Sequence, residues 1–146
     1  MDRQEKTHYG WGERMTIEVG LIGELEYTVG EQDAASHFNP DLPSVLATPR
    51  LVSMLERTAH ETIQPQLPSE QTSVGTLVNI RHLAATPVGM KVRTRVELLE
   101  VNRRRLLFRV EAWDEVEKIA EGEHERAIID RSRFEQRLEE KRKALG

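Results

Sequence analysis

The longest stretch with helical periodicity in the first two thirds of the chain runs from residue 48 to residue 63. Apolar side chains recur there at the spacing of one helix face, at Leu51, Val52, Leu55, Ala59 and Ile63. This pattern predicts a helix that is buried along one side. Thr48 and Pro49 form a start signal, because threonine can cap free N–H groups and proline is tolerated in the first turn. Pro65 cannot continue the helix and marks its end.

On both sides of this helix the apolar positions alternate with polar ones, which is typical of strands with one buried face. Two strands are predicted before the helix, near residues 15–19 and 25–29, and a loop that includes a short helical turn over 30–47. The strands predicted after it cover residues 73–85, 90–98, 106–112 and 118–130. A charged helix follows from residue 131. This order predicts an α+β fold in which a curved antiparallel sheet wraps around a central helix.

The parity of the strands predicts which side chains face the helix. In the strand over 73–85 the even positions are apolar, and His82 shares their parity with Val74, Val78, Ile80 and Ala84. In the last strand, the small residues Ala120 and Gly122 would let the sheet approach the helix closely, and His124 and Arg126 share their face.

Four polar side chains are therefore predicted to point toward the interior: Glu56, which borders the apolar stripe of the helix, with His82, His124 and Arg126. Buried polar groups must be paired, lie near solvent or form a site. Each also has a structural explanation. His82 fits a hydrogen-bonded core histidine and Glu56 a solvated helix edge, while Arg126 fits the partner of a carboxylate. Thr48 taken alone fits a plain N-cap.

Composition limits the functions that fit the chain. Its 146 residues, 38% hydrophobic and 32% charged, predict an N-terminal arm over residues 1–13 and one domain over 14–146. The net charge of −4 and the interleaving of basic with acidic residues argue against nucleic acid. The chain has no cysteine, which excludes disulfides and thiol nucleophiles. Neither a secretory signal nor a membrane-spanning run is evident, so a cytoplasmic location is expected.

Known metal and nucleotide motifs are missing from the sequence. No HExxH or similar ligand spacing predicts a metal site, and no GxSxG, P-loop or GxGxxG motif occurs. Other segments are more informative: VLATPRLVSMLERTA, VGTLVNIRHLAATPVG, RRRLLFRVEAWD and EGEHERAIID. Together they resemble the hot-dog thioesterases, specifically the fluoroacetyl-CoA thioesterase-like branch, over Val45 to Phe134.

The resemblance implies a hot-dog fold, a homodimer, and hydrolysis of a small or medium acyl-CoA thioester without metal or organic cofactor. Its catalytic set falls on Thr48, Glu56 and His82. Arg126 matches a recurrent position of this branch, and Arg126 and Gly75 are expected to bind substrate. The fluoroacetyl-specific enzyme has an aromatic-rich lid upstream of the threonine, whereas here the stretch reads NPDLPSVLA with only Phe38 nearby. General short-acyl or aryl-acyl hydrolysis is therefore expected.

The predicted residues suit thioester hydrolysis, which needs a nucleophile and donors for the developing oxyanion. The helix start at Thr48 supplies N–H groups and partial positive charge. His82 and Glu56 are expected to act as a pair that activates either water or the Thr48 hydroxyl. Two alternatives remain open: a non-catalytic acyl-CoA sensor, and a hot-dog hydratase or dehydratase, which would need an Asp/His pair.

Overall fold

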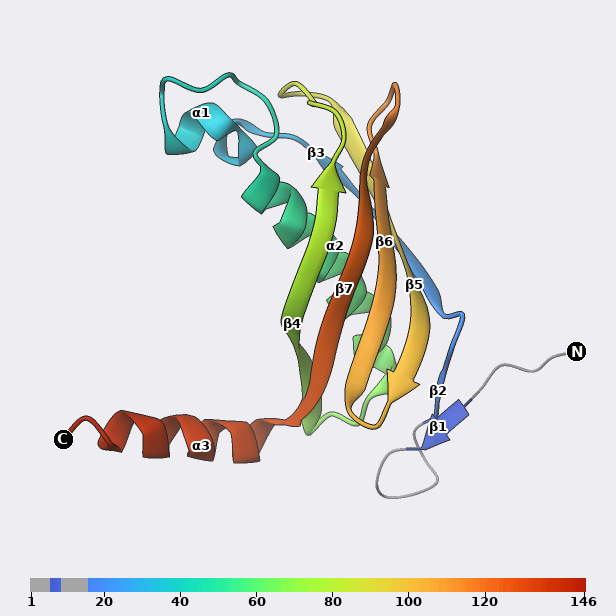
Figure 1. Ribbon diagram of the computed structural model, residues 1–146, viewed down its shortest axis with the longest axis vertical. Coiled ribbons are helices and arrows are strands. Elements are labelled where there is room, and N and C mark those ends of the chain that lie inside the picture. The colour runs from blue at the N-terminus through green and yellow to red at the C-terminus, as the bar shows by residue number, and fades with distance from the viewer. Residues whose placement is uncertain (1–5, 9–15) are drawn as a thin grey trace, which may run out of the picture.

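A five-stranded antiparallel sheet curves around one long helix, α2 (Thr48–Ile63), in the computed structural model, which describes residues 6–8 and 16–146 (Figure 1). The strand order across the sheet is β3-β5-β6-β7-β4. The strands are β3 (Ile22–Thr28), β4 (Gln71–His82), β5 (Lys91–Asn102), β6 (Arg105–Trp113) and β7 (Lys118–Asp130). This arrangement confirms the α+β fold class predicted from the sequence.

Shorter elements surround this unit. Strand β1 (Lys6–His8) pairs with β2 (Thr16–Glu18). The loop before α2 contains η1 (Glu31–Asp33) and α1 (Ala35–Phe38), and η2 (Gln64–Gln66) follows α2. The rest of the predicted arm over 1–13 lies outside the described residues.

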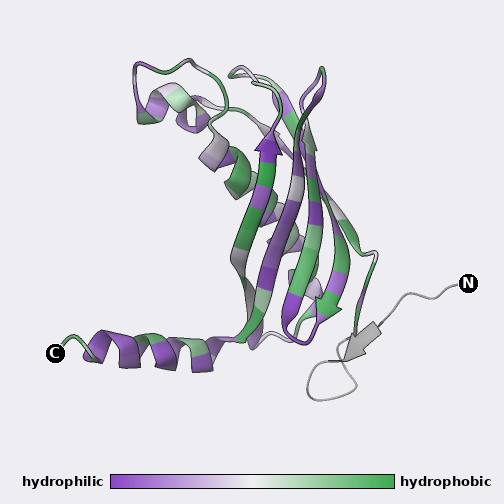
Figure 2. Cartoon of the chain, in the orientation of Figure 1, coloured by the Kyte–Doolittle hydropathy of each residue, from purple (hydrophilic) through white to green (hydrophobic). Residues whose placement is uncertain are grey.

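The predicted charged helix is α3 (Arg131–Lys143), which extends away from the sheet and is largely hydrophilic (Figures 1 and 2). It buries none of its side chains. Helix α2, with sixteen residues, is the longest in the described part of the chain. No described helix combines the length and the apolar character that crossing a bilayer requires.

The core lies between α2 and the concave face of the sheet. The helix buries Leu51, Leu55, Ala59 and Ile63 of the predicted stripe, together with Met54 and Thr58, whereas Val52 is only partly buried. Opposite the helix, the apolar side chains on the inner faces of β5 and β6 are fully buried. These are Val92, Val96, Leu98, Leu106, Phe108, Val110 and Ala112. Fully burying a large apolar side chain contributes about 1.5–3 kcal/mol. This packing therefore fixes the position of α2 relative to the strands.

A β-bulge changes the parity of β4. The register against β7 shifts between Gly75 and Leu77, so an extra residue reverses the faces of the strand. Ser73, before the bulge, is 4% exposed and faces the interior. The prediction that Val74 faces inward was therefore wrong, whereas the inward parity of His82, beyond the bulge, is correct.

Gly122 was expected to let the sheet approach the helix, but it lies against a neighbouring strand. A Cβ atom at this position would stand 2.2 Å from the backbone oxygen of Asn79 and 2.7 Å from the Cα of Ile80, both on β4. Its φ of +156° also disfavours other residues. The glycine therefore permits close packing of β4 on β7 just before His82.

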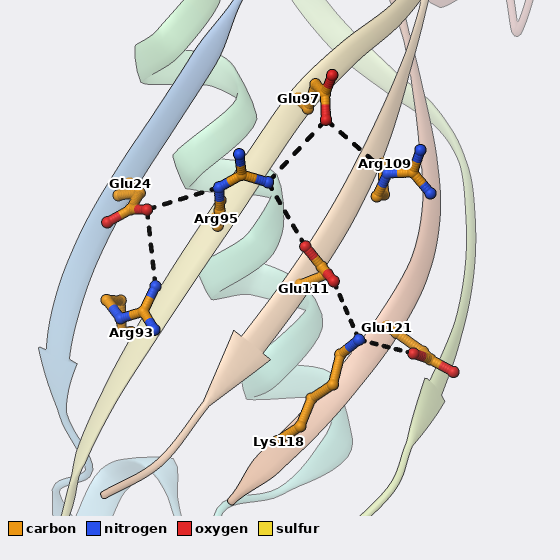
Figure 3. Close-up of polar contacts among 8 residues, drawn as sticks. All are labelled: Glu24, Arg93, Arg95, Glu97, Arg109, Glu111, Lys118 and Glu121. Carbon is orange, nitrogen blue, oxygen red and sulfur yellow. Dashed lines mark hydrogen bonds and ion pairs between the residues drawn. The ribbon is translucent and has the colours of Figure 1, made fainter.

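The convex face of the sheet carries a network of ion pairs across β3, β5, β6 and β7 (Figure 3). Arg95 lies 3.6 Å from both Glu24 and Glu111, and Lys118 lies 3.0 Å from Glu111 and 2.8 Å from Glu121. Exposed pairs of this kind contribute little to stability each. These pairs make the convex face of the sheet a highly charged surface.

Candidate active site

Thr48 and His82 meet at the start of α2 and the end of β4. The Thr48 Oγ1 atom lies 2.8 Å from His82 Nδ1. The N-cap of α2 is Ala47, with no side-chain hydrogen bond to the first turn. The capping role offered for Thr48 was therefore wrong, and its hydroxyl is directed to the imidazole instead. Two predicted catalytic residues, 34 positions apart, are thus joined.

His82 is set up as a base. Burial lowers its pKa below the ordinary value of 6.5, and the nearby backbone of Ala84 opposes this shift only in part. The imidazole is therefore neutral near neutral pH, with one nitrogen able to accept and the other to donate. When Nδ1 accepts the hydroxyl proton of Thr48, Nε2 carries the hydrogen. Nε2 is buried and has no hydrogen-bond partner among the described residues.

A buried carboxylate fixes the backbone that leads into α2. Asp33 is 4% exposed and accepts hydrogen bonds from the Gly30 N–H at 2.8 Å and from Arg50 Nε at 2.9 Å. Its backbone oxygen accepts from the Ala47 N–H at 2.8 Å. Asp33 therefore links the loop to the helix start and positions Thr48. Sequence reasoning missed it, because an acidic residue in a polar loop gives no distinct signal.

A second anchor comes from the AATP segment that follows His82. Thr86 is fully buried, and its hydroxyl donates to Asp114 Oδ2 at 2.9 Å. Its backbone oxygen accepts from the Leu46 N–H at 2.8 Å. These two bonds connect the loop after β4 to the β6–β7 turn and to the segment before Thr48. The threonine of this motif thus has a positioning role.

A separate cluster surrounds Arg126, which is 6% exposed. Its Nε donates to Ser73 Oγ at 2.7 Å, its Nη2 to the Ser73 backbone oxygen at 2.9 Å, and its Nη1 to His124 Nε2 at 3.1 Å. His124 Nδ1 donates to the Leu77 oxygen at 2.9 Å. Because a carbonyl only accepts and a guanidinium only donates, His124 is the neutral Nδ1–H tautomer. Burial lowers its pKa, and the charge of Arg126 acts in the same direction.

Glu56 belongs to this second cluster. A Cβ atom on Gly75 would lie 2.7 Å from Glu56 Oε2, so the glycine makes room for the carboxylate. Burial lowers the pKa of Arg126, and the charge of Glu56 opposes that shift. No hydrogen bond joins Glu56 to His82 within the described chain. Thr48 and Glu56 are eight positions apart on α2, about 12 Å along its axis.

A cavity of about 440 Å³ lies beside the Thr48–His82 pair. Its walls are mainly small and apolar, and its lining comprises Ala35, Val45, Leu46, Ala47, Thr48, His82, Leu83, Ala84 and Ala85. Phe38, the one aromatic residue noted near this segment, is 57% exposed and is not part of the lining. The cavity can therefore hold an apolar group with its polar end against the hydroxyl and imidazole.

Known proteins are similar to this chain in sequence and in fold. The sequence profile of the family described as "Fluoroacetyl-CoA-specific thioesterase" matches residues 29–132. The chain belongs to this family. The fluoroacetyl-CoA thioesterase of Streptantibioticus cattleyicolor is 34% identical over 131 residues, covering 86% of this chain and 94% of that protein.

Solved structures agree with this membership. A structure of the fluoroacetyl-CoA thioesterase FlK has a TM-score of 0.81 and 33% identity, covering 86% of this chain and 97% of that one. A Thermus thermophilus protein described as a thioesterase superfamily member has a TM-score of 0.77 and 28% identity, covering 86% and 96%. The hot-dog fold, the family and the thioester hydrolase class predicted from the sequence are thus confirmed.

We expect Arg126→Ala to lower the melting temperature more than it changes substrate preference. The substitution leaves the Ser73 oxygens and His124 Nε2 without their donor, and each buried unpaired acceptor costs about 1–3 kcal/mol. Differential scanning calorimetry measures the effect. Ser73→Ala, which removes only the Oγ contact, is the matched control and should cost less. Unchanged melting with a strongly raised KM would instead make Arg126 a substrate-binding residue.

Proposed function

We propose that this family member hydrolyses short-chain or aryl acyl-CoA thioesters to a free acid and CoA, with Thr48, Glu56 and His82 as its catalytic residues. The observation that carries the proposal is the 2.8 Å contact between a threonine hydroxyl and a neutral histidine beside an apolar cavity. A hydroxyl paired with a base is the arrangement that nucleophilic or water-assisted acyl transfer needs.

In the proposed reaction His82 Nδ1 takes a proton from the Thr48 hydroxyl, or from a water molecule that this hydroxyl positions. The activated oxygen attacks the thioester carbon, and the partial positive charge at the N-terminus of α2 stabilises the oxyanion. The C–S bond then breaks, and the imidazolium returns the proton to the CoA thiolate. If threonine attacks, a water molecule hydrolyses the acyl-enzyme in a second, equivalent step.

The cavity favours a compact acyl group. Its lining is small and apolar, and the exposed Phe38 does not narrow it. Solved structures of the relative hold acetyl-CoA, or fluoroacetate with CoA. For this chain we propose short-acyl or aryl-acyl substrates without selectivity for fluorine. Gly75, beside Glu56, is proposed to contact the substrate, whereas the donors of Arg126 are engaged by Ser73 and His124.

We further propose a cytoplasmic homodimer in which β4 pairs with itself across a two-fold axis. Strand β4 is an edge of the five-stranded sheet, and Leu77 on it and Leu83 directly after it are 49% and 47% exposed. Antiparallel self-pairing inverts the second copy, so the Gly75 end of one β4 lies beside the His82 end of the other. The carboxylate of Glu56 would then approach the unpaired Nε2 of His82 from the second copy.

An acyl-CoA panel tests the activity. We expect release of CoA from short and aromatic acyl thioesters, detected with a thiol reagent to which this cysteine-free protein contributes no background. Long acyl chains should react more slowly because the cavity is small. Binding without hydrolysis across the whole panel would instead identify an acyl-CoA sensor.

His82→Ala and Glu56→Gln should each reduce kcat by about 10²–10⁴-fold, the usual contribution of a general base. Because the two residues act as one unit, the double variant should fall little below the poorer single variant. Thr48→Ala and Thr48→Ser, with mass spectrometry for an acyl-enzyme, separate the nucleophile from the water-positioning role. Retention of more than about a tenth of the parent rate in His82→Ala would remove it from the catalytic set.

His82 should also determine how the activity depends on pH. His82 must be neutral to accept a proton, so kcat/KM should rise with pH as the imidazole loses its proton and then level off. Burial within one copy lowers the pKa of His82, and the Glu56 carboxylate of the second copy would oppose that shift, so Glu56→Gln should move the midpoint to lower pH. The His82→Ala variant should lack this limb, and its persistence there would assign the titration to another group.

Sedimentation equilibrium at micromolar concentration should give a mass of two chains. Leu77→Glu introduces a charge at the self-pairing edge, where each copy would face the other, and should shift the mass toward one chain. Glu121→Gln is the control, because it changes the charge on β7, one strand in from the edge. A parent protein that sediments as a single chain would contradict the proposed dimer.

A further inference from the structure

A second cavity lies at the opposite end of the sheet, where β7 runs into α3. Its volume is about 240 Å³, and it is lined by Arg104, Ile128, Ile129, Asp130, Arg133, Phe134 and Arg137. We call it the arginine pocket. Three cations and one carboxylate face it, in a chain whose net charge is −4. This local excess of positive charge is not used by the proposed catalytic site.

The one carboxylate of the arginine pocket is already engaged. Asp130 accepts a hydrogen bond from Gln71 Nε2 at 3.1 Å and one from Arg104 Nη2 at 3.4 Å. Arg133 and Arg137, one turn apart on α3, have no ion pair or hydrogen bond from their side chains within the described residues. Their guanidinium groups are free to bind an anion, and the planar fork of arginine matches a phosphate group.

Apolar groups form the other wall of the pocket. Ile128 is 2% exposed, and Phe134 is half-buried between the sheet and the first turns of α3. Arginines beside an aromatic ring favour a ligand that carries both phosphate and a flat ring. A phosphorylated adenine nucleotide has this chemistry, and CoA ends in one that bears a 3′-phosphate and a diphosphate.

The pocket lies far from His82 of the same copy. His82 pairs with Ala120 on β7, whereas Asp130 lies at the far end of that strand, ten residues or about 33 Å away. Helix α3 extends beyond the β4 edge, at the end of the sheet opposite to α1 and the start of α2 (Figure 1). Inverting a second copy along that edge brings its α3 to the end where Thr48 and His82 lie.

We infer that the arginine pocket binds the phosphorylated nucleotide end of the acyl-CoA whose thioester lies in the Thr48–His82 site of the second copy. The inference rests on the proposed function and assigns the CoA-binding residues that it lacks. Arg133 and Arg137 supply the phosphate contacts, and Phe134 lies against the base. The acyl group and the nucleotide of one substrate are thus recognised by different copies of the chain.

The double variant Arg133→Ala/Arg137→Ala tests this assignment. Both side chains are exposed, so the fold should be retained. We expect KM for the acyl-CoA to rise roughly tenfold or more, as for loss of charge-assisted hydrogen bonds, with kcat nearly unchanged. Arg142→Ala is the matched control, because Arg142 lies on the same helix, pairs with Glu139 and does not line the pocket. Equal KM values in the double variant and the parent would overturn the inference.

A truncated substrate separates the pocket from the catalytic site. The N-acetylcysteamine thioester of the same acyl group lacks the nucleotide, so the parent and the double variant should hydrolyse it equally. An equal loss on both substrates would mean that α3 acts on the fold, and would overturn the inference. If the parent hydrolyses neither substrate, the proposed function fails. Titration with adenosine 3′,5′-bisphosphate then tests the arginine pocket by itself. Binding to the parent that is lost in the double variant supports the pocket, and no binding to the parent refutes it.

Mixed dimers test the contribution of the second copy. One subunit carries His82→Ala with an intact pocket, and the other carries Arg133→Ala/Arg137→Ala with intact His82. The only intact His82 then works with the intact arginine pocket of the other subunit. The mixed dimer should therefore show the KM of the parent, and half its kcat because one of its two sites is inactive. A KM as high as that of the double variant would place nucleotide and thioester in the same copy and overturn the inference.

Discussion

The packing of α2 against the concave face of the sheet is the constraint on which the rest of the structure depends. The buried stripe of the helix and the apolar inner faces of β5 and β6 leave α2 one stable position. That position places Thr48 at one end of the sheet and Glu56 near its middle. The catalytic candidates therefore lie on rigid elements, and their separation is set by the rise of a helix.

Polar groups that would be costly inside this core are satisfied almost completely. Asp33 and Thr86 tie loops to the start of α2, and Arg126 bonds Ser73 and His124. His82 Nε2 is an exception among the described residues. A donor buried without an acceptor loses its hydration without compensation. This imbalance lies at the edge strand where we propose that a second copy supplies a carboxylate.

The two proposed roles of the dimer have one geometric origin. Antiparallel pairing of β4 would exchange the ends of the sheet between copies, so each His82 would meet the region that carries Glu56 and Arg126 in the other. The same inversion would bring the arginine pocket of one copy to the end of the sheet where Thr48 and His82 of the other copy lie. An elongated substrate with an apolar head and a phosphorylated tail is suited to a site that is divided in this way.

Much of the fold could be predicted from the sequence. Alternation with a period of two or 3.6 gave the strands, the helix and the inward parity of His82, His124 and Arg126, because burial of one face imposes that period locally. Motif resemblance gave the family. Thr48, Glu56 and His82 could be selected as candidates, although their mutual arrangement could not be derived from spacing.

Tertiary structure decided what depends on contacts between distant segments. The bulge at Gly75 reversed the face of Ser73, because register reflects pairing with β7 and not the composition of β4. Thr48 lies in the first turn of α2 and does not cap it, and its hydroxyl bonds a histidine that β4 brings to the start of the helix. Asp33 carries no local pattern at all. Periodic burial produces a local pattern in the sequence, whereas a hydrogen bond between distant residues forms only when the whole fold brings its two atoms together.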